Sequence, residues 1–141
     1  MKVLLPIDGS DCSYDTLKWV TETFDKATTD YFLISITPIV MDFPMTEEVM
    51  SATTELLKIT KKNLEAQGCR VLAAEQLVGF PNSQICQYAD EGDFDLVIVG
   101  SHGHSGFTRI VLGSVSEGVL EHCGKPVIVY RKAKKLKGQT C

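Results

Sequence analysis

A segment between residues 100 and 116 has the spacing of small residues that could hold a phosphate group. It combines glycines at regular intervals with serines at the head of an expected helix: Gly100, Gly103, Gly106, Gly113, Ser114 and Ser116. Small residues let a backbone approach a ligand closely. A helix N-terminus offers unpaired N–H groups and the positive end of a dipole, and serine hydroxyls would add donors. The pattern favours an anion cradle, with a tight structural loop and an ordinary N-cap as the alternative.

The end of the first expected strand carries a second polar segment, Pro6-Ile7-Asp8-Gly9-Ser10. Asp8 could accept a hydrogen bond from a ribose or base donor of a ligand. An Asp-Gly-Ser sequence is also common in turns, so a purely structural role is the alternative. The glycine segment is what favours a binding role for Asp8.

Two histidines, His102 and His104, lie within the glycine segment. They could act as a base or as metal ligands, but no Cys is near and the Asp residues are distant, which makes a poor metal set. A Walker sequence is absent because no Lys follows Gly106. We therefore expect no catalytic or metal site, and any phosphoryl transfer should be slow and incidental.

Five apolar runs rich in Val, Ile and Leu are expected to form strands: residues 2–7, 31–36, 70–78, 95–99 and 126–130. Continuous runs of this kind suit strands covered on both faces. Four helices are expected between them. They begin after Ser10 or Asp11, near Thr46, at Asn82 or Ser83, and at Ser114, and they end near Phe24, Gly68, Glu91 and Gly124. For the fourth helix, Ser114 and Glu117 are expected to form a capping box.

The alternation of strands and helices predicts an α/β fold with an open sheet of five parallel strands and helices on both faces. In such a sheet a ligand lies outside the carboxyl ends of the strands, where the strand order reverses. The two polar segments follow the first and fourth strands, so we expect them to meet there. An apolar loop at residues 39–46 either moves or packs.

Composition indicates one globular domain, expected over residues 1–131, with a basic tail at 132–141. The 141 residues are 44% hydrophobic and 23% charged, and the net charge is −4. The last eleven residues hold five of the 14 basic residues and no acid, so the rest of the chain is strongly acidic. An acidic body does not favour nucleic-acid binding. No apolar run is long enough to span a membrane, and we expect a soluble, cytoplasmic protein.

The chain has an odd number of cysteines at long spacings: Cys12, Cys69, Cys86, Cys123 and Cys141. This usage argues against a disulfide framework and against a zinc site. Most of these thiols are expected to be buried and to behave as small apolar side chains.

The residues described above resemble the universal stress protein family, in its ATP-binding subgroup. The family pattern of Gly, two residues, Gly, nine residues, Gly and then Ser or Thr is met by Gly100, Gly103, Gly113 and Ser114. Further similar segments are Pro6-x-Asp8-Gly9-Ser10, Gly79-x-Pro81, the run 113–117 and the closing strand from Pro126. The resemblance covers about residues 1–131.

The resemblance implies a flavodoxin-like, Rossmann-like sheet with ATP, AMP or another adenine nucleotide, with or without Mg²⁺, between strands one and four. Asp8 would face the adenine or ribose, Ile36 would line the adenine pocket, and Val99 and Gly100 would lie along the ribose and α-phosphate. The implied site comprises Pro6, Asp8, Ile36, Val99, Gly100, Gly103, His104, Gly106, Gly113, Ser114, Val115 and Ser116. The phosphates would be held by Gly103, His104, Gly113, Ser114, Val115 and Ser116.

Position 104 departs from the family pattern, since many relatives carry Arg or Lys where this chain has His104. A neutral His is a weaker phosphate partner, so affinity for a γ-phosphate would fall or depend on pH near ~6.5. The resemblance also implies a homodimer through the last strand, Val127 to Tyr130, which would present an exposed edge. A stress-response or signalling module with an unknown protein partner is expected. A dimeric scaffold that binds no nucleotide, or a weak ATPase, is the alternative.

Overall fold

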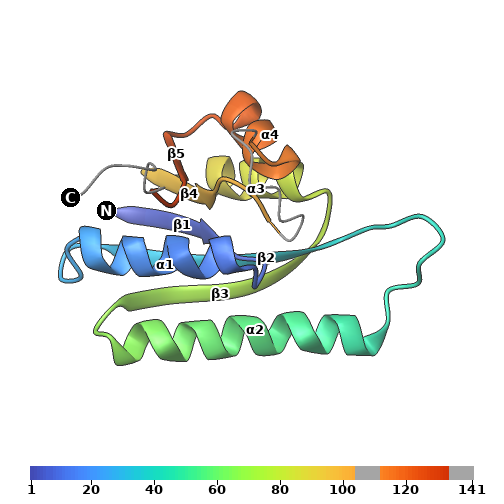
Figure 1. Cartoon of the computed structure of the whole chain (residues 1–141), viewed down its shortest axis with the longest axis horizontal. Coiled ribbons are helices and arrows are strands. Elements are labelled where there is room, and N and C mark those ends of the chain that lie inside the picture. The colour runs from blue at the N-terminus through green and yellow to red at the C-terminus, as the bar shows by residue number, and fades with distance from the viewer. Residues whose placement is uncertain (104–111, 134–141) are drawn as a thin grey trace, which may run out of the picture.

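The computed structural model describes residues 1–103 and 112–133, in which strands and helices alternate along the chain (Figure 1). The elements are β1 (Lys2–Pro6), α1 (Asp11–Thr23), β2 (Asp30–Pro38), α2 (Glu47–Ala66), β3 (Arg70–Gly79), α3 (Pro81–Glu91), β4 (Leu96–Gly100), α4 (Ser114–His122) and β5 (Val127–Tyr130). Every predicted element is present. No boundary differs by more than two residues, and β2, for example, extends two residues beyond its predicted end.

The strands form one parallel sheet in the order β3-β2-β1-β4-β5. The prediction of an open, Rossmann-like sheet of five parallel strands is therefore confirmed. The strand order reverses between β1 and β4, which pair in parallel from Val3 opposite Leu96. This pairing creates the switch point at which an open α/β sheet leaves a crevice.

Two separate apolar cores cover the two faces of the sheet. On one face α1 and α2 pack through Leu17, Val20 and Leu57 against alternate strand residues such as Leu33. On the other face α3 and α4 pack through residues that include Ile85 and Val119, and Figure 1 shows the two helix pairs on opposite sides. The continuous apolar runs of the strands follow from this double coverage.

Local signals set the beginnings of α1 and α2. The Ser10 side chain accepts a hydrogen bond from the Ser13 amide at 3.2 Å, and Thr46 accepts from the Val49 amide at 3.3 Å. These caps satisfy amides that the first helical turn leaves unpaired. Beyond the end of α2, Gly68 adopts a φ of +86°, the left-handed conformation that the predicted stop requires.

The capping box predicted for α4 is wrong. Gly113 is the N-cap and Ser114 is the first helical residue, because the Glu117 amide donates to the Gly113 carbonyl at 2.9 Å. The cap has no side-chain hydrogen bond. Two other helix boundaries also differ from the prediction. Helix α3 begins at Pro81, which suits the first helical position because proline has no N–H to leave unpaired. Helix α4 ends at His122.

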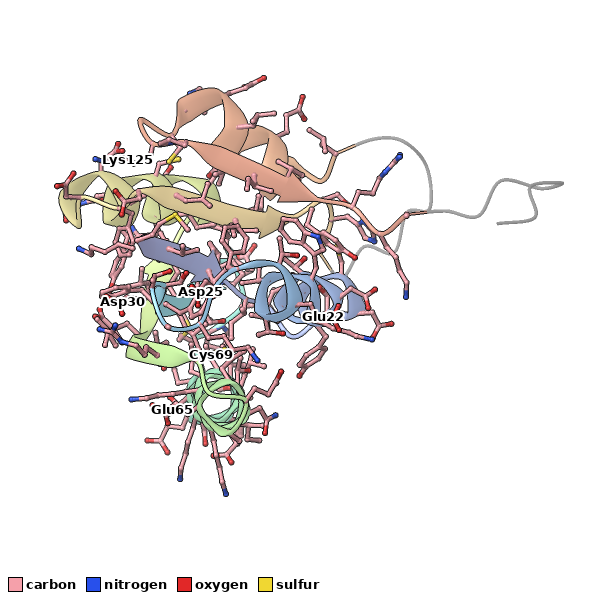
Figure 2. The ribbon with its side chains drawn as sticks, turned by 90° about the vertical axis from the view of Figure 1, so that its left-hand side faces the viewer. Glu22, Asp25, Asp30, Glu65, Cys69 and Lys125 are labelled. Carbon is pink, nitrogen blue, oxygen red and sulfur yellow. The ribbon has the colours of Figure 1, made fainter. Side chains whose placement is uncertain are left out.

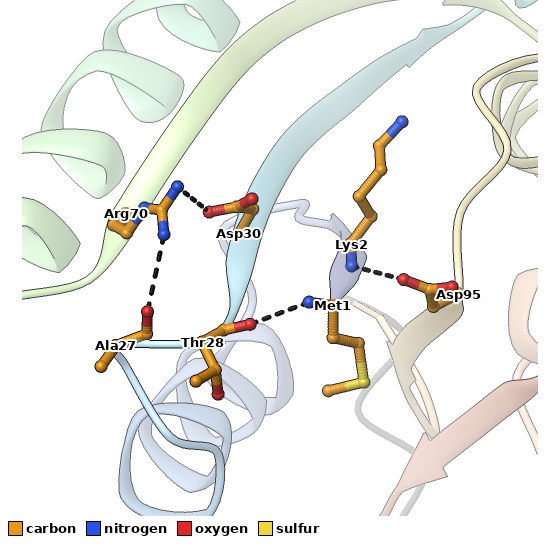
Figure 3. Close-up of polar contacts among 7 residues, drawn as sticks. All are labelled: Met1, Lys2, Ala27, Thr28, Asp30, Arg70 and Asp95. Atoms are coloured by element: carbon orange, nitrogen blue, oxygen red, sulfur yellow. Dashed lines mark hydrogen bonds and ion pairs between the residues drawn. The ribbon is translucent and has the colours of Figure 1, made fainter.

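Polar contacts join the amino ends of the strands. Figure 2 looks onto this end, with Asp30 at the start of β2, Cys69 just before β3 and Lys125 just before β5. Figure 3 shows the bonds that hold it: the Met1 ammonium donates to the Thr28 carbonyl at 2.8 Å, the Lys2 amide to Asp95 at 2.7 Å, and Arg70 pairs with Asp30 at 3.0 Å. The amino ends are thereby tied together, away from the crevice.

The cysteines in the described part of the chain are free thiols, as predicted. Cys12, Cys69 and Cys86 are buried, and Cys123 is half-buried. Burial, together with the nearby Cys123, raises the pKa of the Cys86 thiol to about 11. Cys86 therefore stays protonated at neutral pH and packs as a small apolar group. Cys141 lies outside the described residues.

The apolar loop between β2 and α2 does not pack into the core. Its side chains include Met41 at 87% exposure and Phe43 at 76% exposure, and Figure 1 shows the loop reaching away from the sheet. Of the two sequence-based alternatives for this loop, packing is excluded. Across residues 1–103 and 112–133, no helix has both the length and the apolarity needed to cross a membrane.

Replacing Leu33 with Ala should lower the free energy of unfolding by about 2–5 kcal/mol, because Leu33 is fully buried and the smaller side chain leaves a cavity. Leu72→Ala is the matched control. Leu72 lies on the edge strand β3 and is 55% exposed, so its truncation should cost less than about 1 kcal/mol. Urea denaturation measures both values, and equal losses would contradict the assigned core.

Candidate functional site

A cavity of about 630 Å³ opens at the carboxyl ends of β1, β2 and β4. Its volume lies in the range of small-molecule sites. Segments far apart in the sequence contribute to it: residues 6–13, 35–38, 49–56, 81–85, 99–103 and 113–116. The cavity therefore lies at the switch point between β1 and β4, where the sequence placed its two polar segments.

Ten of the residues predicted for the site line this cavity. They are Pro6, Asp8, Ile36, Val99, Gly100, Gly103, Gly113, Ser114, Val115 and Ser116. The other two, His104 and Gly106, lie outside the described residues. The structure thus brings together side chains that are more than 100 positions apart in the sequence.

The Asp8 carboxylate is oriented by the turn that follows β1. Its Oδ1 accepts hydrogen bonds from the Ser10 amide at 2.9 Å and from the Ser10 hydroxyl at 2.6 Å. Its Oδ2 faces the β4 side of the cavity, where a Cβ added to Gly103 would lie 2.6 Å from it. Gly103 thus lets the loop after β4 approach the carboxylate, and a larger residue would displace it.

Two other glycines of the motif allow segments of the protein to pack closely. A Cβ at Gly100 would lie 2.9 Å from the Cys12 sulfur, so this glycine brings β4 close to α1. A Cβ at Gly113 would lie 3.1 Å from the His102 Cα, so this glycine brings the start of α4 close to the end of β4. Both positions therefore serve packing as well as lining the cavity.

The N-terminus of α4 is fixed against the end of β4. The Gly113 amide donates to the Ser101 carbonyl at 2.7 Å, and the buried Ser116 hydroxyl donates to the same carbonyl at 2.8 Å. The amides of Ser114 and Val115 precede the first helical hydrogen bond and lie at the cavity wall. They lie at the positive end of the α4 helix dipole, a position that favours an anion.

The Ser116 hydroxyl was expected to add a hydrogen-bond donor for a phosphate, but it is used differently. Its hydrogen is directed to the Ser101 and Gly113 carbonyls, at 2.8 and 3.0 Å, so it holds the loop and offers no donor to the cavity. The Ser114 hydroxyl, by contrast, is on an exposed residue at the cavity wall. Backbone amides and Ser114 therefore supply the donors at this end.

Sequence reasoning missed the wall that α2 provides. Val49, Thr53 and Leu56 recur at helical spacing on α2, and all three line the cavity. His102 was also left out of the predicted site, although it is half-buried at the cavity wall with Nδ1 3.0 Å from the Ser101 hydroxyl. The helical stripe was visible in the sequence, but periodicity does not tell a core-facing stripe from a cavity-facing one.

The cavity has two chemically different ends. At β2, α2 and α3 its lining is largely aliphatic and includes Ile36, Leu56 and Ile85. At β4 and α4 it is richer in glycine and serine and includes the start of a helix, although Val99, His102 and Val115 also line it. In the part of the chain that the structure describes, no three His, Cys, Asp or Glu side chains are grouped to hold a metal ion. The arrangement suits a ligand with an apolar ring at one end and an anionic group at the other.

Replacing Ser116 with Ala should lower the free energy of unfolding by about 0.5–1.5 kcal/mol, because the buried hydroxyl bonds to Ser101 and Gly113 would be lost. Ser114→Ala is the matched control two positions earlier, and its exposed side chain makes no cap hydrogen bond. Thermal or urea denaturation should show a loss for Ser116→Ala alone. A comparable loss in both variants would contradict the role assigned to Ser116.

Comparison with known proteins gives a consistent assignment. A sequence model of the Universal stress protein family matches residues 1–131. Universal stress protein MJ0531 of Methanocaldococcus jannaschii is 32% identical over 144 residues, which cover 95% of this chain and 84% of that protein. The solved structure of hypothetical protein MJ0577, from the same organism, superposes with a TM-score of 0.77 and 30% identity, covering 95% of this chain and 97% of that one.

Several solved structures of the same fold contain adenine nucleotides. The Archaeoglobus fulgidus universal stress protein in complex with dAMP has a TM-score of 0.72 and 22% identity, covering 92% of this chain and 96% of that one. An Arabidopsis thaliana family member was solved with AMP, and another universal stress protein with cAMP. The family match and the 32% identity, together with the shared fold, show that this chain belongs to the universal stress protein family.

Proposed function

We propose that this protein binds an adenine nucleotide, ATP or AMP, in the cavity at the β1–β4 switch point. The observation that carries the proposal is the pairing of an aliphatic end with a helix N-terminus inside one cavity of about 630 Å³. An adenine ring suits the first end and a phosphate the second. Relatives solved with AMP, dAMP and cAMP support the same ligand class.

Each end of the proposed ligand has a counterpart in the cavity lining. The adenine would lie against Ile36 and the α2 residues, and the Asp8 carboxylate would accept from the ribose hydroxyls. The amides of Ser114 and Val115 would hold the first phosphate, with Gly103 and Gly113 allowing the backbone to come close. Pro6, Val99 and Gly100 would complete the wall. The outer phosphates would be bound by His104, Gly106 and a Mg²⁺ ion.

A binding module is favoured over an enzyme by the chemistry of the lining. The described lining has no lysine or arginine, and Asp8 is turned toward Ser10 and Gly103. Phosphoryl transfer depends on positioned cations and on a group that orients the nucleophile. We therefore propose that nucleotide occupancy alters a surface for a protein partner in a stress response, with slow hydrolysis at most.

The first test is calorimetric titration of the full chain, stripped of nucleotide by unfolding and refolding, with AMP, ATP and GTP. Adenine nucleotides should bind, and Gly103→Ala should weaken that binding at least about tenfold, because its Cβ would collide with the Asp8 carboxylate. Gly68→Ala is the control, since it strains a left-handed backbone position and its added Cβ would meet no atom within 4 Å. It should cost stability and leave the affinity unchanged.

Absence of binding by any adenine nucleotide would overturn the proposed function. The non-binding scaffold would then be the better account, since the same glycines also serve packing. Equal weakening by Gly103→Ala and Gly68→Ala would show that lost stability, and not the Asp8 collision, lowers the affinity.

We also propose that the protein forms a homodimer through β5. This strand pairs with β4 on one side and stands at the edge of the sheet. Hydrogen bonds from the Val97 amide to the Pro126 carbonyl and from the Ser101 amide to the Tyr130 carbonyl fix its register. In a parallel pair, residues then alternate, so the amides of Val127 and Val129 point to the open edge. Such an edge is a ready template for a second copy.

Val129→Pro tests this dimer, because it removes an amide that points outward and leaves the bonds to β4 in place. Sedimentation equilibrium should show a dimer for the native chain and a monomer for Val129→Pro, with the urea midpoint of the monomer fold little changed. Ile128→Pro is the contrasting variant and should destabilise the fold, because its amide faces β4. A native chain that sediments as a monomer would rule out the dimer.

A further inference from the structure

A chain of hydrogen-bonded side chains links β3, β2 and α2 behind the aliphatic end of the cavity. The Gln76 amide nitrogen lies 3.3 Å from the Thr37 hydroxyl oxygen, which lies 3.3 Å from the Thr53 hydroxyl oxygen. The Thr53 hydroxyl in turn donates to the Val49 carbonyl at 3.2 Å. Thr37 and Thr53 line the cavity, whereas Gln76 stands behind them.

The orientation of the Gln76 amide is set by its other contacts. Its nitrogen also donates to the Met50 sulfur at 3.3 Å, and a thioether sulfur can only accept. Its oxygen lies 2.9 Å from the Thr54 hydroxyl, which shares its single hydrogen with the Met50 carbonyl at 3.0 Å. The nitrogen therefore faces Thr37 and donates to it.

This orientation determines where the two hydroxyl hydrogens point. Thr53 directs its hydrogen to the Val49 carbonyl, and Thr37, which already accepts from Gln76, directs its own hydrogen to Thr53. Each hydroxyl has one hydrogen and two lone pairs. Both hydrogens are used within the network, so each threonine hydroxyl keeps one lone pair that can accept a hydrogen bond from a ligand. The two threonine hydroxyls can therefore accept a hydrogen bond from a ligand and cannot donate one.

The two threonines stand where the base of a nucleotide would lie. Thr37 is one residue after Ile36 at the end of β2, and Thr53 is on the α2 wall. Strand β2 is two places from β4 in the sheet, which is about 10 Å at the usual strand spacing. A base at β2 and a phosphate at the start of α4 thus fit the two ends of one nucleotide.

We infer that Thr37 and Thr53, oriented by Gln76, select a purine with an amino group at its 6-position over one with a carbonyl there. An exocyclic amino group would donate to the open lone pairs, while a carbonyl oxygen would meet two acceptors and lose its own hydrogen bond to water. The inference rests on the proposed nucleotide site and adds the residues that set its base preference. Gln76 acts in it as a positioning residue.

The test compares AMP with inosine 5′-monophosphate, which has a carbonyl at the 6-position, by calorimetry on the stripped full chain. The native protein should prefer AMP by about tenfold or more. Thr37→Val and Thr53→Val should each reduce this preference to less than about threefold, mainly by weakening AMP. Gln76→Leu should also reduce it, by strengthening inosine monophosphate, because the freed Thr37 hydroxyl can turn its hydrogen into the cavity.

Thr60→Val is the matched control, since Thr60 is a buried threonine of the same helix that does not line this cavity. It should keep the native preference. If a threonine variant folds poorly, Gln76→Leu still tests the inference, because Gln76 lies on the edge strand β3. Its effect is measured as the ratio of the affinities for AMP and inosine monophosphate. Urea midpoints would accompany every titration.

The outcomes separate this inference from the proposed function. Equal binding of AMP and inosine monophosphate by the native chain would overturn the inference and leave nucleotide binding in place. A preference for AMP that survives in all three network variants would also overturn it, since other groups would then set the selection. Failure of the native chain to bind either nucleotide would overturn the proposed function together with the inference.

Discussion

The parallel pairing of β1 with β4 is the contact on which the rest of the molecule depends. Crossovers between parallel strands are right-handed, so a chain that adds β2 and β3 on one side of β1 puts α1 and α2 on one face. When it then returns to place β4 on the other side of β1, α3 and α4 must cover the opposite face. The loops after β1 and β4 diverge at this point, and the cavity is the space between them.

Much of this architecture follows from local sequence, because each strand is buried on both faces and therefore reads as a continuous apolar run. Caps at Ser10 and Thr46 and the left-handed Gly68 were also readable. The end of β2 could not be predicted from the local sequence. Thr37 and Pro38 belong to the strand because they pair with Val78 and Gly79 of β3, and a long-range pairing of this kind leaves no local signal. The cap of α4 was also misread, because the carbonyl of Gly113 receives the first helical hydrogen bond and the Ser114 side chain makes no cap hydrogen bond.

The candidate site was predictable where chemistry and backbone requirements coincide. Asp8, Gly103 and Gly113 stood out because they belong to the two polar segments that follow the first and fourth strands, and the structure brings all three to one cavity. The wall formed by Thr53 and its helix could not be predicted, because an apolar helical stripe looks the same whether it covers a core or a cavity. Ser116 shows the converse: a residue of the right type at the right place uses its hydroxyl to hold the loop.

The cavity lining extends from Pro6 to Ser116, so it draws on nearly every part of the described domain. During synthesis no shorter stretch of chain can hold a ligand there, because the last wall arrives only with α4. A ligand that recognises this cavity would therefore recognise completed, folded molecules alone. At a hundredfold excess over its dissociation constant it would add about 2.7 kcal/mol to the stability of the whole domain. Cellular ligand concentration would then set how much of this protein survives proteolysis, with no change in its synthesis.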